Sequence, residues 1–270
     1  AVLTVLGVVS APTLLRLLNT PEEVMGFAVP YLRIYFAGIT FPILYNIGSA
    51  ILRAVGDSKR PLYFLIACCL TNVLLDLLFV VGLGMGVAGA AVATVLSQVV
   101  SVILTFGALM RSKECFRFSF KELRMDMNLL KSMLRIGLPV GLQSTMYSIS
   151  NILVQSSING FGTDVIAAWT AVGKVDSIFW MAINAFGIAV TTFAGQNFGA
   201  GKYDRVHKCV RVSMGMAMGM TIVLSGLLLL TERFTLGLFC RDAEVLAYGE
   251  KMMFYMVTFY FTYVPIEVLS

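Results

Sequence analysis

Charged side chains and histidine are scarce in this sequence. Only 13% of its 270 residues are Asp, Glu, Lys or Arg, and His207 is the single histidine. The five cysteines form no CxxC pair and have no spacing that would join them to the histidine, so packing or solvated roles are favoured over a metal site or a disulfide framework. The cysteines are Cys68, Cys69, Cys115, Cys209 and Cys240.

Motifs of hydrolytic and nucleotide-dependent enzymes are also missing. The sequence contains no HExxH, no GxSxG and no paired histidines, the arrangements that commonly support metal-dependent or nucleophilic catalysis. The glycine-rich stretches GVAGAAVA and GQNFGAGK follow no predicted strand and do not match a phosphate-binding P-loop. We therefore expect no enzyme activity, no bound nucleotide, no metal and no cofactor.

Long apolar blocks are what the sequence has in abundance. Hydrophobic residues make up 58% of the chain, and they are grouped in blocks instead of amphipathic stripes. Because about 20 apolar residues are needed to cross a bilayer, an all-α polytopic membrane protein with about eight transmembrane helices is predicted. The eight blocks cover residues 1–18, 25–52, 61–83, 87–109, 132–158, 164–194, 208–231 and 244–270.

The positions of the basic residues predict an orientation. Lys and Arg gather at residues 53–60, 111–135 and 202–211, whereas the loops between these regions are short or acidic. Since basic loops stay on the cytoplasmic side of a membrane, the first block should run from inside to outside. The net charge of +5 then reflects membrane orientation, and we expect no nucleic-acid partner.

This orientation predicts which loops can be labelled from outside the cell. In a cysteine-free variant of the complete protein, Asn159→Cys should react with a membrane-impermeant maleimide in intact cells, because residue 159 follows the fifth block on its outer side. Ser112→Cys should react only after the membrane has been permeabilised. Labelling of Ser112→Cys in intact cells would show that the orientation is inverted.

A weak internal repeat suggests two pseudo-symmetric helical lobes. A shift of 221 residues lays LLRLLNTPEEVMGFAV over TLGLFCRDAEVLAYGE and pairs Ser49 with Ser270. The shift contains an even number of spans, so the copies keep one orientation and should be related by an axis along the membrane normal. We expect a partial N-terminal lobe at residues 1–110, a cytoplasmic basic linker at 111–131 and a partial C-terminal lobe at 132–270. The chain would then be an internal piece of a protein with twelve spans.

A polar stripe on the fifth block is one candidate cavity lining. Gln143, Tyr147, Asn151 and Gln155 follow one another at four-residue steps and therefore share one helix face. The stripe could line a water-filled cavity that holds cargo. Alternatively, it could hold helices together through hydrogen bonds worth about 0.6 kcal/mol each.

The sixth block places two opposite charges in an apolar run. Asp176, Trp180 and Asn184 lie four residues apart, and we expect this stripe to face the cavity between the lobes, where an acid and an aromatic ring suit an organic cation. Lys174 projects to a different side of the helix, roughly 15 Å from its start. A charge at that depth is costly, so Lys174 is expected to turn into its own lobe toward an acidic or carbonyl partner, in either a structural or a coupling role.

Two further acids and an amide complete the candidate set. Asp76 follows Asn72 by one helical turn in the third block, where it could serve ion coupling or structural hydrogen bonding. Glu267 lies in the eighth block, and the repeat aligns it with Asn46 of the second block. A buried carboxyl group can take up and release a proton, so Glu267 and Asp176 are the preferred candidates for protonation or cation contact.

Prolines are predicted to bend the two helices that carry these polar residues. Pro42 and Pro265 lie within four residues of Asn46 and Glu267, respectively. Proline removes a helical hydrogen bond and clashes with the preceding turn, so both helices should be broken nearby. A broken helix beside a polar residue suits a mobile gate, and simple kinking without gating is an equal alternative.

Four stretches resemble the multidrug and toxic compound extrusion (MATE) transporters. They are ILRAVGDSKRP, TNVLLDLLFVVGLGMGVAGAAVATVLSQ, RIGLPVGLQS and AGQNFGAGKYDRV. The resemblance implies a two-lobed exporter in the cell membrane that moves cationic or amphipathic compounds outward in exchange for protons or sodium ions. One sodium-coupled branch of that family has a glutamate near the position of Tyr147, so the tyrosine argues against coupling by that route. A lipid-linked sugar flippase is the alternative, although its cavity should carry several basic residues and only Lys174 lies deep here.

Overall fold

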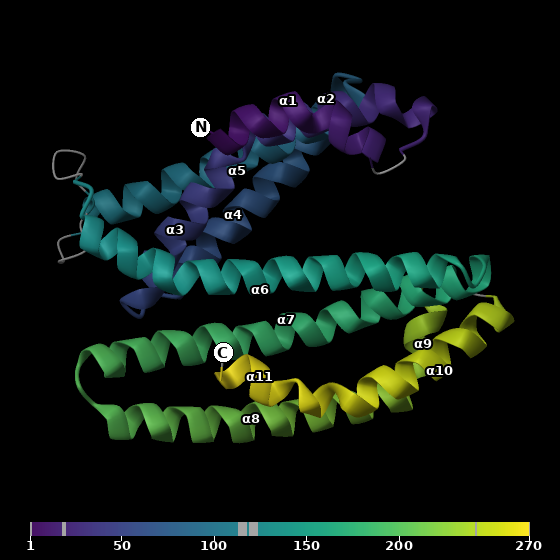
Figure 1. The fold of residues 1–270 in the computed structure, drawn as a ribbon. Helices are drawn as coiled ribbons and strands as arrows, with labels where there is room; N and C mark the ends of the chain where they lie inside the picture. Colours follow the sequence, from purple (N-terminus) through teal and green to yellow (C-terminus); the bar gives the residue numbers. More distant parts are fainter. Residues whose placement is uncertain (1, 18–19, 113–117, 119–123, 241, 270) are drawn as a thin grey trace. The chain divides into compact units, whose positions relative to one another are not determined.

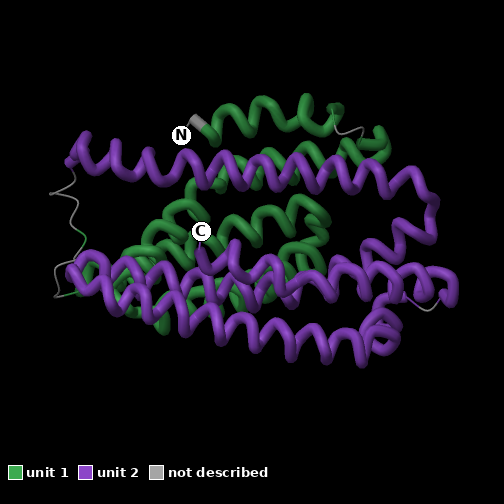
Figure 2. Tube along the Cα trace, turned by 60° about the horizontal axis from the view of Figure 1, so that its bottom comes forward, with its two compact units in different colours: residues 1–123 green, residues 124–270 purple. Residues whose placement is uncertain are grey.

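The computed structural model describes residues 2–17, 20–112, 118, 124–240 and 242–269, and within these ranges the chain is helical and has no strand (Figure 1). The chain divides into two compact units, residues 1–123 and 124–270 (Figure 2). The boundary falls in the basic segment 111–131, which was predicted as the linker. Residues 113–117 and 119–123 of that segment, and Ser270 of the repeat pair, lie outside the described residues.

Unit 1 is organised around one long helix, α5. The helix has a face of small residues, and every fourth residue from Ala93 to Leu109 is buried. This face lets α5 lie against α2, α3 and α4, while α1 packs on α2. The elements are α1 (Val2–Leu17), α2 (Glu22–Gly38), α3 (Thr40–Ala54), α4 (Lys59–Asp76), the π-helical segment η1 (Leu77–Gly82) and α5 (Gly86–Arg111).

Unit 2 is organised around α7, which lies against α8 and α10 and also contacts α6 (Figure 1). Asp126 caps α6, because its carboxylate accepts hydrogen bonds from the backbone amides of Asn128 and Leu129 at 2.8 and 3.2 Å. Gly201, with φ +68°, permits the tight turn between α7 and α8. The elements are α6 (Met127–Asn159), α7 (Thr163–Gly199), α8 (Tyr203–Leu230), α9 (Glu232–Gly237), α10 (Ala243–Phe259), the 3-10 turn η3 (Tyr260–Thr262) and α11 (Val264–Leu269).

The apolar core of unit 2 is made by α7 and the C-terminal helices. Phe179 and Ile183 of α7 are fully buried, as is Val264 of α11, and Met253 and Val257 of α10 are almost so. The pairs Phe179 and Ile183, and Met253 and Val257, are each four residues apart, so each helix turns one face toward this core. Phe179 therefore fixes the rotation of α7, and with it the direction in which the neighbouring polar residues point.

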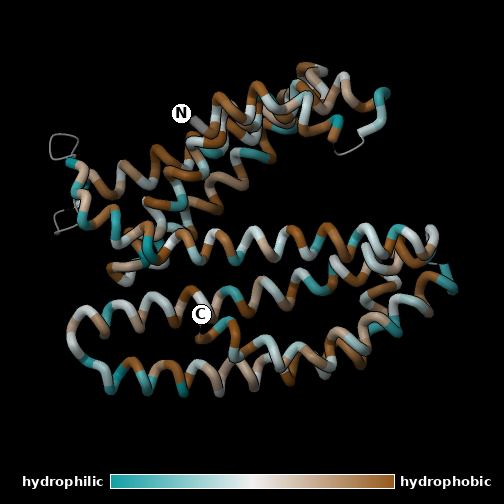
Figure 3. The backbone as a smooth tube through the Cα atoms, in the orientation of Figure 1, coloured by the Kyte–Doolittle hydropathy of each residue, from teal (hydrophilic) through white to brown (hydrophobic). Residues whose placement is uncertain are grey.

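All eight predicted blocks are helical, and hydrophobic residues run along most of their length (Figure 3). Among the described helices, five are long and apolar enough to cross a membrane, or six if the bent pair α2–α3 counts as one span. The remaining two blocks correspond to α1, whose described apolar part is Leu3–Leu17, and to α6, which carries the polar stripe. The short helix α9, in the loop before α10, was not predicted.

The bend predicted near Pro42 is confirmed, and near Pro265 the α-helix is interrupted. The α2–α3 pair bends by 40° at Ile39, and the residue four before Pro42 is Gly38, where α2 ends. In unit 2, α10 gives way to the 3-10 turn η3, and Pro265 follows at the start of α11. The carbonyl group with which each proline ring would clash belongs to Gly38, the last residue of α2, and to Phe261, inside the turn η3.

The helix bounds repeat with the spacing found in the sequence. Helices α2 and α10 both have 17 residues, and both bounds of α10, Ala243 and Phe259, lie 221 residues after those of α2. Each helix is followed by a break and a shorter helix. The internal repeat therefore has a structural counterpart within each unit, while its axis along the membrane normal stays a prediction.

Candidate functional site

Asp176 is the centre of a hydrogen-bonded group inside unit 2. Its half-buried carboxylate accepts a hydrogen bond from the indole nitrogen of Trp180, with 2.8 Å between Nε1 and Oδ2. The four-residue spacing on α7 makes this contact possible, because residues i and i+4 are neighbours on a helix. The other carboxylate oxygen, Oδ1, accepts a short hydrogen bond from the hydroxyl of Tyr260. Asp176 thus accepts hydrogen bonds from two aromatic side chains: Trp180 on its own helix, and Tyr260, which is 84 residues away in the sequence.

The break between α10 and α11 brings two tyrosines to α7. Tyr260 and Tyr263 are three residues apart across a 3-10 turn, where side chains at i and i+3 project on the same side. The ring of Tyr260 stacks on Phe179 with centroids 4.0 Å apart and an interplanar angle of 11°. The ring of Tyr263 meets Trp180 edge-on at 4.6 Å. The predicted break therefore builds part of the site.

A second acid extends this group along α11. The hydroxyl of Tyr263 donates a hydrogen bond to Glu267 Oε2 over 3.1 Å. The carboxylate of Glu267 lies against Gly187 of α7, where an added Cβ would be only 2.6 Å from Oε1. Glycine at residue 187 therefore leaves the space that the second carboxylate occupies.

Tyr147 links helix α6 to the same group. It is 44% exposed, and its side chain lies near that of Tyr263. We name the seven connected residues the acidic-aromatic cluster, and the sequence analysis had selected four of them. The cluster comprises Tyr147, Asp176, Phe179, Trp180, Tyr260, Tyr263 and Glu267.

The cluster has the chemistry of a cation site. Asp176 forms no ion pair with a Lys or Arg among the described residues. Its charge is stabilised instead by hydrogen-bond donors, beside aromatic rings whose faces attract cations. No group of three or more His, Cys, Asp or Glu side chains in the described ranges could hold a metal ion.

Sequence reasoning missed Tyr260 and Tyr263. Their signal was the stretch YFTYVP, in which two tyrosines three residues apart precede Pro265. Pro265 predicted the break, and a 3-10 turn is a common form for a helix end to take. Their partners on α7 could not be predicted, because they depend on the packing of helices far apart in the chain.

Other members of the two predicted stripes stay outside the cluster. Asn184 is exposed, and its side chain donates a hydrogen bond to the carbonyl oxygen of Trp180 at 2.9 Å. Gln143 and Asn151 are exposed on α6, which buries none of its residues. Gln155 accepts a hydrogen bond from the indole of Trp169 at 3.1 Å, so the end of the α6 stripe helps to join α6 to α7.

The predicted position of Lys174 was wrong. Lys174 is exposed on α7 instead of turning into its own unit, and within the described residues its ammonium group has no ion-pair partner. Val172, Val175 and Phe179 form the buried face of α7. At 100° per residue, Lys174 projects about 140° away from Phe179. Packing of the apolar face therefore directs the lysine outward.

Unit 1 contains a second polar pair that has unused bonding capacity. Asn72 and Asp76 are half-buried on α4, and the atoms Nδ2 of Asn72 and Oδ1 of Asp76 are buried without a hydrogen-bond partner among the described residues. The helix changes to a π-helical segment directly after Asp76, and such segments are frequent at functional sites. Asn46, the other candidate in unit 1, is exposed on α3.

Comparison with known proteins identifies two similar proteins of Bacillus subtilis. The probable multidrug resistance protein YoeA is 31% identical over 276 residues, which cover 100% of this chain and 60% of YoeA. The probable multidrug resistance protein YpnP is 33% identical over 248 residues, covering 92% of this chain and 55% of YpnP. The chain thus spans less than two thirds of the length of these relatives.

Solved structures share the fold. A crystal structure of a MATE protein in complex with MaD3S matches with a TM-score of 0.90 and 22% identity, covering 99% of this chain and 60% of the other. The outward-facing structure of a multidrug resistance MATE family transporter matches with a TM-score of 0.87 and 23% identity, covering 96% of this chain and 58% of the other. The MatE family model matches residues 1–78 and 139–270, which is more than half of the sequence. The chain therefore belongs to the MatE family of multi-pass membrane transporters.

Proposed function

We propose that the complete protein exports cationic or amphipathic small molecules across the cell membrane by alternating access, in exchange for protons or sodium ions. The acidic-aromatic cluster carries this proposal. It places an acid that has no basic partner among the described residues beside Trp180 and Tyr260, in a unit with three candidate membrane spans. Such a group can bind an organic cation through charge and ring faces together. YoeA and YpnP are named as probable multidrug resistance proteins, which supports export of drugs.

The coupling ion is proposed to bind at Asn72 and Asp76 in unit 1. Two polar atoms that are buried without partners are costly unless a ligand, a proton or water satisfies them. A proton on Asp76, or a sodium ion held by its carboxylate, would satisfy Oδ1. Exchange of that ion across the membrane would supply the energy for export.

Removal of the Asp76 charge is expected to abolish ion-driven export. The complete protein and its Asp76→Asn variant would be reconstituted in vesicles, and uptake or release of a fluorescent cationic dye would be followed after a proton or a sodium gradient is imposed. The unchanged protein should respond to one gradient, and Asp76→Asn should lose about ten-fold or more of that response, because loss of one charge-assisted bond costs about 1.5–3 kcal/mol.

Asp57→Asn is the matched control, because Asp57 lies outside the apolar spans and forms an exposed ion pair with Arg60. If neither the proton gradient nor the sodium gradient drove dye transport, the proposed function would be contradicted. Gradient-driven transport that survives Asp76→Asn would reject only the coupling site. None of the relatives named above is a lipid-linked sugar flippase, and no observation in the structure favours that alternative.

A further inference from the structure

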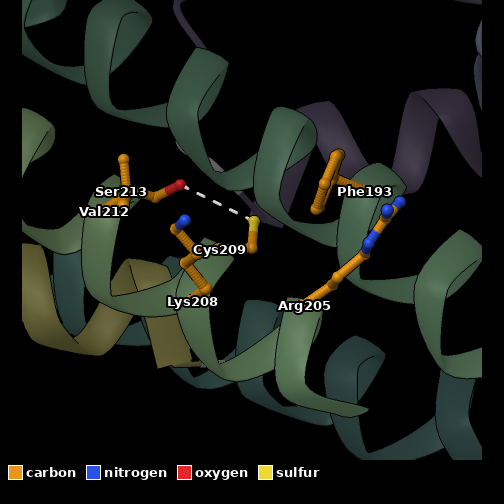
Figure 4. A pocket seen from close by; sticks show the side chains of 6 residues that line it. All are labelled: Phe193, Arg205, Lys208, Cys209, Val212 and Ser213. Carbon is orange, nitrogen blue, oxygen red and sulfur yellow. Dashed lines mark hydrogen bonds between the residues drawn. The ribbon is translucent and has the colours of Figure 1, made fainter. Parts of the chain in front are cut away.

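A cavity of about 380 Å³ lies where α7 ends and α8 begins (Figure 4), and none of its lining residues belongs to the acidic-aromatic cluster. One lining residue, Phe193, comes from α7, and the other five come from the first three turns of α8. The five are Arg205, Lys208, Cys209, Val212 and Ser213.

The five residues of α8 form one helix face. Counted from Arg205, they occupy positions i, i+3, i+4, i+7 and i+8, the spacing of a single stripe along a helix. Basic residues stand at the beginning of the stripe, and Val212 lies two turns further along α8, toward its apolar part. The cavity therefore combines two basic side chains at one end of the stripe with apolar lining from Val212 and, on α7, from Phe193.

The basic end of the stripe is free to bind an anion. Arg205 and Lys208 are exposed, and within the described residues neither forms an ion pair. None of the described residues that line the cavity is acidic. The hydroxyl of Ser213, beside Val212 at the far end of the stripe, lies 3.8 Å from the sulfur of Cys209 (Figure 4). Arg and Lys together are a common arrangement for a phosphate group.

The apolar lining residues, Phe193 and Val212, explain why a free anion is not the best occupant. Phe193 and Val212 are 45% and 50% exposed, so the cavity presents uncovered apolar surface beside its charges. Helices α7 and α8 are both candidate spans, and the basic turn between them is predicted to lie on the cytoplasmic side. The cavity is therefore at the level where phospholipid headgroups meet acyl chains.

We propose that this cavity binds an anionic phospholipid from the cytoplasmic leaflet. The phosphate group would contact Arg205 and Lys208, and an acyl chain would pass over Phe193 and Val212. Basic pockets between membrane helices on the cytoplasmic side are suited to such headgroups. This site does not depend on the transported cargo, because it shares no residue with the acidic-aromatic cluster.

Cys209 provides a local probe for this proposal. The complete protein would be prepared in detergent with every other cysteine replaced by serine, and the rate of Cys209 modification by a maleimide would be measured. Phosphatidylglycerol should slow the reaction, because the lipid would cover the half-buried thiol. Phosphatidylcholine, which has no net charge, and inorganic phosphate, which has no acyl chain, should protect much less.

Arg205→Gln combined with Lys208→Gln should weaken phosphatidylglycerol protection by about 25-fold, since each basic residue near anionic lipid is worth about five-fold in binding. Lys202→Gln combined with Arg211→Gln removes the same charge from residues outside the cavity and should retain most of the protection. All variants would be checked for unchanged elution on size exclusion.

Three results would overturn the proposal. Equal protection by both phospholipids would indicate a site that recognises only acyl chains. Equal protection by inorganic phosphate would indicate a simple anion site. Equal loss in the two double variants would indicate general surface charge instead of a defined cavity.

Discussion

Asp176→Asn is expected to reduce export of a cationic dye by about ten- to a hundred-fold while the protein still inserts and folds. The substitution preserves side-chain volume but removes the charge that would attract the cation. The carboxylate of Asp176 accepts hydrogen bonds from Trp180 and Tyr260, one on each oxygen. In asparagine one of these oxygens is replaced by an amide nitrogen, which donates instead of accepting. Hydrogen bonds to charged groups contribute about 1.5–3 kcal/mol, and a loss of this size corresponds to a reduction in rate or affinity of about ten- to a hundred-fold. The measurement is dye efflux from cells that express the complete protein, normalised to the amount in the membrane.

Two further variants separate a functional role of Asp176 from a structural one. Asp164→Asn is the matched control, because Asp164 is exposed in the first turn of the same helix. Tyr260→Phe keeps the ring that stacks on Phe179 but removes the hydroxyl donor, so it should lower efflux less than Asp176→Asn and leave folding unchanged. If Asp176→Asn exported the dye as fast as Asp164→Asn, the cluster would not be the cation site.

Gly38→Ala is expected to destabilise the protein by about 1–3 kcal/mol, the usual cost of overpacking a fitted interior. Gly38 is buried at the end of α2, where an added Cβ would lie 2.4 and 2.7 Å from the two Cγ atoms of Val95 on α5. Val95 is β-branched, so rotation about χ1 gives little relief. The measurement is the thermal midpoint of the purified complete protein and the fraction that elutes as a single species.

Gly26→Ala is the control in the same helix, and it should have the opposite sign. No atom lies within 4 Å of a Cβ added at Gly26, so alanine should stabilise the helix by about 0.5–1 kcal/mol. Combining Gly38→Ala with Val95→Ala should recover part of the lost stability, since the clashing methyl groups are removed. Similar thermal midpoints for Gly38→Ala and Gly26→Ala would show that the close approach of α2 and α5 does not limit stability.

The sequence by itself determined the features that depend on neighbours within one helix. Apolar blocks predicted every long helix, because length and composition decide whether a segment can cross a bilayer. Pro42 and Pro265 predicted the two helix breaks, since the clash of proline is with its own preceding turn. The spacing of Asp176 and Trp180 predicted that they share a face, and the structure adds the hydrogen bond between them.

Only the tertiary structure decided which face of each helix turns inward and what it meets there. The two-residue spacing placed Asp176 and Lys174 on different sides of α7, but the assignment of Lys174 to the interior was wrong. The apolar stripe that contains Val175 and Phe179 settles this rotation, because burying it against α10 and α11 leaves Asp176 at its edge and Lys174 outside. The bond from Tyr260 to Asp176 joins residues 84 apart. Helical periodicity acts over a few residues, so a contact of that kind follows from how the folded helices pack and not from local pattern.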